Sequence, residues 1–199
     1  MKAADTSTVM GRRQNGAFSL IEMIGVLAVI AILVSILIPK VASTISQSRI
    51  SSTVESYETL RGAAQAHVCQ YYAYNKMYTT NATPAELSNW DTGVLIPEGL
   101  MDEPFAAKIG KGQVLQVVAG GGNAGNGYKL NGTNDVTAGN AYSVECVISN
   151  VVEEDAYDLA SRLNGGLVPA APGNLTTGCV EYLVVTNGTG TLYLYVAGL

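Results

Sequence analysis

An unbroken apolar run near the N-terminus constrains this chain more than any other feature. Residues 18–38 read FSLIEMIGVLAVIAILVSILI, and Glu22 is the only charged residue among them. As a helix, a segment of this length spans about 30 Å, which is the thickness of the hydrocarbon core of a bilayer. The run therefore predicts a membrane-spanning helix over residues 18–38.

Basic residues before the run predict its orientation. Residues 1–17 contain Arg12 and Arg13, and their only acidic residue is Asp5. Because basic flanks stay in the cytoplasm, we expect the N-terminus there and the rest of the chain across the membrane. A secretory signal peptide is the rival interpretation, but its apolar core is shorter and a small-residue cleavage site follows it. Here the run is longer and ends at Pro39.

Glu22 lies inside the apolar run and is a candidate functional residue. A carboxylate in a membrane segment is costly, so such residues usually mark a function or a partner. The alternative is that Glu22 lies near the membrane interface and is simply solvated. An ordinary single-pass anchor gives no reason for an acidic residue at this place.

Together these residues resemble the class III prepilin signal of type IV pilins and type II secretion pseudopilins. The matching elements are Arg12-Arg13, a small residue, Phe18-Ser19-Leu20-Ile21-Glu22 and the long apolar run. In that family a membrane aspartyl peptidase cuts on the cytoplasmic side, before the Phe, and methylates the new amine. The resemblance implies that residues 1–17 are a cleaved leader and that Phe18 becomes the N-methylated terminus. It also implies that Glu22 is the acidic residue which the family has inside the helix.

The cleavage site departs from the family's pattern. The family usually has Gly directly before the Phe, but here Gly16 is followed by Ala17. Cleavage after Ala17 keeps the usual spacing from Phe18 to Glu22, and a small residue is sterically acceptable there. Cleavage after Gly16 would leave Ala17 first and move Glu22 one place along. We prefer cleavage after Ala17, and both alternatives stay open.

The helical pattern continues beyond the apolar run. Apolar residues follow mostly in steps of three and four, at Val41, Ile45, Ile50, Val54, Tyr57, Ala64, Val68 and Tyr71. This spacing predicts one long helix over residues 18–77, with an apolar stripe toward a core beyond Pro39. Pro39 removes an amide donor and is expected to kink or locally melt the helix, as a hinge. A proline that only marks the membrane exit is the alternative.

Residues 78–199 predict a globular α+β head domain. The expected elements are strands at 114–118 and 142–148, a helix at 153–164 and a β-hairpin made of 180–186 and 191–196. Residues 86–105 weakly resemble the short helix and loop that follow the first helix in many pseudopilins. The predicted fold class is therefore α+β and pilin-like: a long N-terminal helix packed on a small antiparallel sheet with a C-terminal β-hairpin.

The three cysteines, Cys69, Cys146 and Cys179, match no paired zinc-ligand pattern. One bridge and one free thiol is the simplest arrangement for a domain outside the cytoplasm. A disulfide between Cys146 and Cys179 would resemble the disulfide-bounded C-terminal loop of many type IV pilins. It would stabilise the fold by about 3–4 kcal/mol in the loop-entropy model. Cys69 is then expected to be a buried free thiol.

Other candidate sites have simpler explanations. The glycines of residues 120–125 match a dinucleotide-binding pattern, but no helix is predicted after them. Four acidic residues within 153–158 could bind calcium, but the helix dipole already accounts for acidic residues in a first turn. His67 is the only histidine, so a Ser-His-Asp triad has a single candidate base and a histidine-rich zinc site is unavailable. We expect no metal, no cofactor and no catalytic residues.

The resemblance implies a structural filament subunit of a type IV pilus or a type II secretion pseudopilus, and not an enzyme. Expected partners are copies of itself and related subunits, the prepilin peptidase and a membrane assembly platform. The chain is expected in the bacterial inner membrane with a cytoplasmic N-terminus, and after assembly in an extracellular or periplasmic filament. The net charge of -5 argues against the basic surface that nucleic-acid binding needs. The alternative function is a membrane-tethered binding module, such as a minor pilin-like adhesin.

Overall fold

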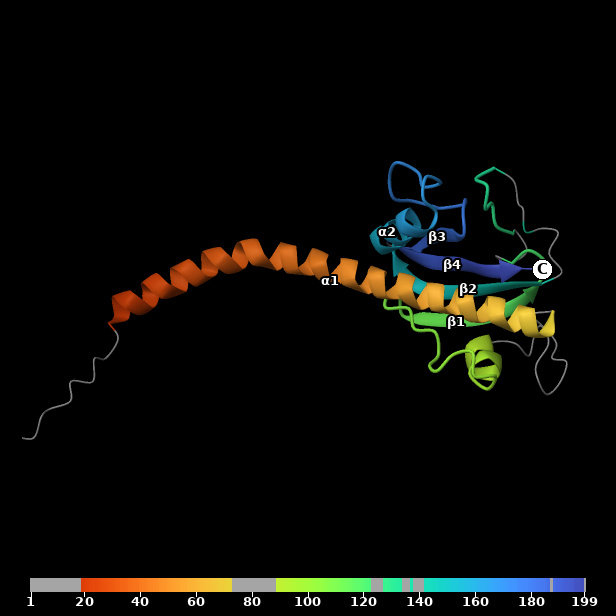
Figure 1. Ribbon diagram of the computed structural model, residues 1–199. Helices are drawn as coiled ribbons and strands as arrows, with labels where there is room; N and C mark the ends of the chain where they lie inside the picture. The colour runs from red at the N-terminus through yellow and green to blue at the C-terminus, as the bar shows by residue number, and fades with distance from the viewer. Residues whose placement is uncertain are drawn as a thin grey trace, which may run out of the picture. The chain divides into compact units, whose positions relative to one another are not determined.

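The computed structural model describes residues 19–72, 89–122, 127–133, 137, 142–186 and 188–198. The chain divides into two compact units, Met1–Ser43 and Thr44–Leu199, and each is described by itself. Helix α1 (Leu20–Tyr71) contributes residues to both units (Figure 1). The prediction of one long N-terminal helix is confirmed.

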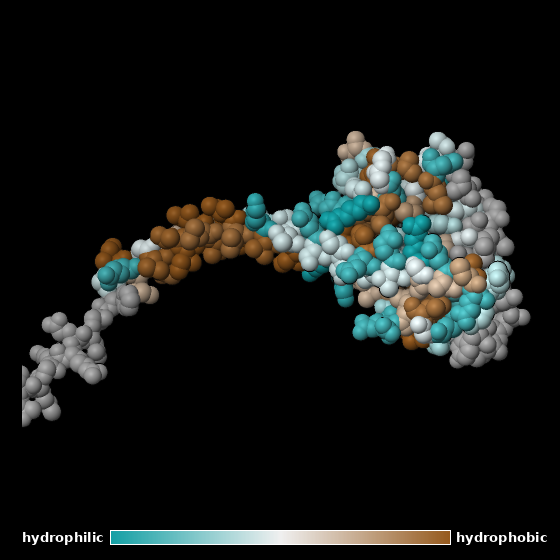
Figure 2. Space-filling model, in the orientation of Figure 1, coloured by the Kyte–Doolittle hydropathy of each residue, from teal (hydrophilic) through white to brown (hydrophobic). Residues whose placement is uncertain are grey.

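Within the described residues, the first unit is the N-terminal part of α1. Its large apolar side chains are exposed to between 43% at Val34 and 77% at Leu20. They form the continuous brown surface of this segment in Figure 2. Pro39 lies inside α1, which remains helical through it. The local melting expected at Pro39 is therefore not observed, and its role as a hinge stays a prediction.

The second unit contains a four-stranded antiparallel sheet in the order β1-β2-β4-β3. The strands are β1 (Gly112–Ala119), β2 (Tyr142–Val152), β3 (Val180–Thr186) and β4 (Thr189–Gly198). Strands β3 and β4 form the predicted C-terminal hairpin, and β4 pairs with β2 on its other side. The predicted α+β, pilin-like architecture is confirmed, with α1 packed on the sheet (Figure 1).

Helix α2 (Glu153–Leu163) matches the helix predicted at 153–164, and it follows β2 directly because β2 extends to Val152, beyond the predicted end at 148. Three acidic residues occupy its first turn and Arg162 lies in its last turn, so both ends complement the helix dipole. Gly165 has a φ of 59°, the left-handed conformation that commonly ends a helix. Ala156, Leu159 and Ala160 are buried against the core.

The core lies between the second part of α1 and one face of the sheet. In α1 its members recur at helical spacing, at Ile50, Thr53, Tyr57, Leu60, Ala64 and His67. On the sheet they alternate along the strands, as Val144, Cys146 and Ile148 in β2 and Leu192, Leu194 and Val196 in β4. The predicted stripe on α1 is therefore correct from Ile50 onward. The prediction is wrong for Val41 and Ile45, because these side chains are 47% and 48% exposed.

The buried carboxylate of Asp91 organises the described part of the segment between α1 and β1. Asp91 begins a single turn of π-helix, η2 (Asp91–Leu95). Its side chain accepts hydrogen bonds from the backbone N–H of Thr92 at 2.9 Å and of Phe105 at 3.0 Å. The Gln113 side chain donates to the carbonyl of Phe105 and accepts from the N–H of Ala107. These contacts hold residues 101–108 in place beside α1.

Candidate processing and assembly segment

The first turn of α1 is closed by a reciprocal pair of hydrogen bonds between Ser19 and Glu22. The backbone N–H of Ser19 donates to the Glu22 carboxylate at 2.8 Å, and the N–H of Glu22 donates to Ser19 Oγ at 3.3 Å. This is the capping box, in which two N–H groups that the helix leaves free find side-chain acceptors. Ser19 was not singled out from the sequence, although the spacing Ser-x-x-Glu before an apolar run is its signal.

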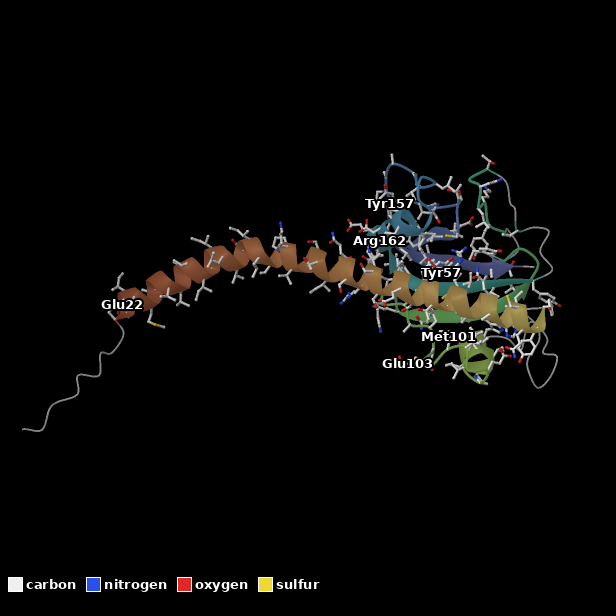
Figure 3. All side chains as sticks on the ribbon, in the orientation of Figure 1. Glu22, Tyr57, Met101, Glu103, Tyr157 and Arg162 are labelled. Carbon is white, nitrogen blue, oxygen red and sulfur yellow. The ribbon has the colours of Figure 1, made fainter. Side chains whose placement is uncertain are left out.

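Glu22 is exposed, and it lies at the N-terminal end of α1 (Figure 3). Among the described residues no lysine, arginine or histidine forms an ion pair with it. Its neighbours Leu20 and Ile21 are 77% and 73% exposed. The Glu22 carboxylate is thus held by the N-terminus of its own helix, where the apolar surface begins. Because Glu22 is exposed, its carboxylate is accessible to another molecule.

The apolar part of α1 needs a partner that the described chain does not supply. In the described part of the chain, α1 is the helix long and apolar enough to cross a membrane, and none of its most apolar stretch is buried. Exposure of this much apolar surface to water is strongly unfavourable. Lipid or the same segment of other molecules must cover it.

The remaining processing residues, Gly16, Ala17 and Phe18, lie outside the described residues. The choice between cleavage after Gly16 and after Ala17 therefore stays open. In the sequence, Phe18 directly precedes Ser19 of the capping box.

The predicted disulfide between Cys146 and Cys179 is wrong, because both residues are free thiols. Cys146 in β2 is paired with Leu194 of β4, whereas Cys179 directly precedes β3, on the far side of β4. Two strand spacings amount to about 9.5 Å. A disulfide requires Cα atoms within about 7 Å, so β4 prevents the bridge.

Cys69 is a free thiol, as predicted, but it is exposed and not buried. Burial raises the pKa of both the Cys146 and the Cys179 thiols, so these two are protonated at neutral pH. The three cysteines therefore add no cross-link to the head, and its stability rests on packing.

The other candidate sites form no reactive cluster in the part of the chain that the structure describes. No group of three or more His, Cys, Asp or Glu side chains is placed there to hold a metal ion. Asp155 of α2 instead accepts a hydrogen bond from Ser46 Oγ of α1 at 2.7 Å. His67 Nδ1 lies 2.6 Å from a Glu98 carboxylate oxygen, and both side chains are almost fully buried.

Residues 12–38 match the family model described as the prokaryotic N-terminal methylation motif. The chain carries the signature of the type IV pilin and pseudopilin family. The matched residues include Arg12-Arg13, the expected cleavage region and the capping box of this pilin-like protein. Neither a curated protein nor a solved structure shows significant similarity to the chain.

The motif and the fold together indicate a pilin-like protein with a prepilin-type N-terminus. The prepilin-type motif implies processing by prepilin peptidase, and the apolar helix indicates anchoring in the inner membrane before assembly. The family is generally structural and non-enzymatic. Because the match ends at residue 38, it describes the anchor and says nothing of what the head contacts.

Proposed function

We propose that this pilin-like protein is a structural subunit of a type IV pilus or of a type II secretion pseudopilus. In this proposal, residues 1–17 are removed, residues 18–38 anchor the precursor in the inner membrane, and residues 78–199 form the exposed head. The observation that carries the proposal is the exposed apolar part of α1 behind a prepilin-type motif. Partners are copies of the chain, related subunits, the prepilin peptidase and a membrane assembly platform.

Packing of α1 against its copies is the proposed source of filament stability. The exposed side chains are mostly Leu, Ile and Val, and full burial of one such side chain is worth about 1.5–3 kcal/mol. In the membrane, lipid covers these side chains. In a filament outside the membrane, the same segment of neighbouring subunits replaces the lipid, so extraction leaves no apolar surface in water.

Glu22 is the proposed register residue of the assembly. After cleavage before Phe18, that residue carries a cationic amine in an apolar surrounding. Glu22 of a neighbouring copy pairs with it when the two helices are offset by four residues, or about 6 Å along the axis. Any other offset leaves a poorly solvated charge unpaired, which is costly. The pair therefore selects the register of the subunits and adds little net stability.

In the unassembled subunit, the capping box holds the Glu22 carboxylate at the N-terminus of α1. Before a neighbour binds, Glu22 accepts the N–H of Ser19, and this hydrogen bond keeps the carboxylate at the helix terminus. The neighbour's amine is then received by a group that is already in position, which lowers the ordering cost of pairing.

Mechanical shearing of cells that produce the full-length chain tests the proposal. We expect fibres in the sheared fraction that contain the protein without residues 1–17. The second candidate function, a membrane-tethered binding module, predicts an uncut chain that stays with the membrane and dissolves only in detergent. That result would contradict the filament.

A further inference from the structure

The head carries an open groove beside α1 that no part of the described chain fills. It has a volume of about 540 Å³, and α1 lines one side of it with Glu55, Ser56 and Thr59. Residues 101–106 and Lys108 line the other side. The hydrogen bonds of Asp91 and Gln113 to this segment hold the second wall in place.

The groove is acidic and is also lined by apolar residues. Glu55, Asp102 and Glu103 are exposed on its walls, against one cation, Lys108. Among the described residues none of the three carboxylates forms an ion pair. Met101 and Pro104 are among the apolar lining residues, as is Phe105, which is 2% exposed. Such a groove fits a side chain with an apolar stem and a cationic head, and planar guanidinium binds carboxylates in two-pronged fashion.

Arg162 presents a guanidinium of this kind on another side of the head. It is exposed in the last turn of α2, and its Nη1 donates to Ser51 Oγ of α1 at 2.7 Å. In the described chain no carboxylate forms an ion pair with it, including Asp158 one turn away on α2. The other guanidinium donors remain available. Figure 3 shows Arg162 on one side of α1, and Met101 and Glu103 on the opposite side.

We propose that Arg162 of one copy binds in the acidic groove of Glu55, Asp102 and Glu103 of the next copy. This proposal rests on the filament function and names the head surfaces that meet in it. Two different, complementary surfaces on one molecule produce a head-to-tail contact, and repeated contacts of that kind generate an open helical assembly.

Charge reversal and charge exchange test the contact in cells that assemble the wild-type filament. Glu103→Arg and Arg162→Glu should each reduce sheared filament about tenfold or more, because like charges then meet. The exchanged double variant should recover most of the yield. Lys111→Glu is the matched control, because Lys111 is exposed and lines no part of the groove. Normal yield from both single variants, or no recovery in the double variant, would overturn the contact.

Cross-linking gives a second readout that does not depend on yield. In a Cys69→Ser background, the double variant Glu103→Cys and Arg162→Cys should form a ladder of covalent multimers when sheared filaments are oxidised. Either cysteine variant alone should give no ladder beyond dimers. Intact filaments without a ladder would contradict the contact and leave the filament function standing. Cleaved subunits that never form filaments, even in the wild type, would instead contradict the filament function.

Discussion

The two parts of α1 differ in what surrounds their apolar side chains. From Ile50 onward, the helix has a core in its own chain: Ile50, Leu60 and Ala64 are fully buried against the sheet. Before Ser43, side chains of the same kind are exposed, and Leu33 is 61% exposed. One continuous helix thus carries a stripe that completes a domain and an all-round apolar surface that other molecules must cover. The difference indicates that one part of α1 completes the core of the head, whereas the other part needs cover from outside the described chain.

The largest expected effect comes from removing the charge of Glu22, in the part of α1 that we propose packs against copies of itself. Glu22→Val should leave membrane insertion and leader cleavage intact but reduce filament yield about a hundredfold, because the neighbour's amine stays unpaired in an apolar setting. Quantification of sheared fibres and of the cleaved membrane pool measures the two effects separately. Fibres at wild-type yield and with an unchanged axial rise would remove the proposed role of Glu22.

A matched pair of truncations in the two parts of α1 tests the comparison itself. Leu60→Ala should lower the free energy of unfolding of the head by about 2–5 kcal/mol, because it leaves a cavity in a packed core. Leu33→Ala should leave head unfolding unchanged, since its side chain contacts no core. Trp90 is the single tryptophan and is fully buried in the head, so its fluorescence in detergent reports unfolding. Equal effects of the two variants would contradict the division.

Tyr57 provides a smaller and pH-dependent effect. Its hydroxyl donates to the Tyr195 carbonyl, and burial raises the pKa of Tyr57 well above its usual range. The protonated phenol therefore stabilises the fold below the unfolded pKa of about 10, and this contribution is lost as the pH rises above that value. Tyr57→Phe should cost about 1 kcal/mol at pH 7. It should also make stability fall less steeply above pH 10 in denaturant titrations; an unchanged slope would contradict the assignment.

The smallest effect is expected at the capping box. Ser19→Ala removes one acceptor and leaves the carboxylate of Glu22 in place. We expect about a twofold loss of filament, far less than for Glu22→Val, because a single exposed cap contributes modestly. A loss as large as that of Glu22→Val would mean that Glu22 acts through its own helix terminus and not through a neighbour.

Much of this fold could be predicted because its signals are local. Hydrophobic periodicity predicts the helices α1 and α2, and alternation of apolar residues predicts β2. The turn sequence Asn187-Gly188 predicts the hairpin of β3 and β4. In the candidate segment, Glu22 is recognisable because an acidic residue contrasts with the apolar run around it. The Ser19 cap was equally visible in the sequence, but its role appears only when both hydrogen bonds are seen.

The wrong predictions depend on contacts between distant parts of the chain. The order β1-β2-β4-β3 places β4 between Cys146 and Cys179, and no local pattern reports that order. Likewise, Val41 and Ile45 have the right spacing for a core stripe, but the head does not extend to them. Periodicity shows which side of a helix is apolar, and it does not show where its partner ends.

In the proposed filament, α1 keeps its apolar part after processing and is covered by copies of itself. Mass spectrometry of subunits released from sheared, purified filaments tests this most directly. We expect an intact chain that begins at Phe18 with a methylated amine and still includes residues 18–38. A product that begins at Met1, or one that has lost residues 18–38, would contradict it.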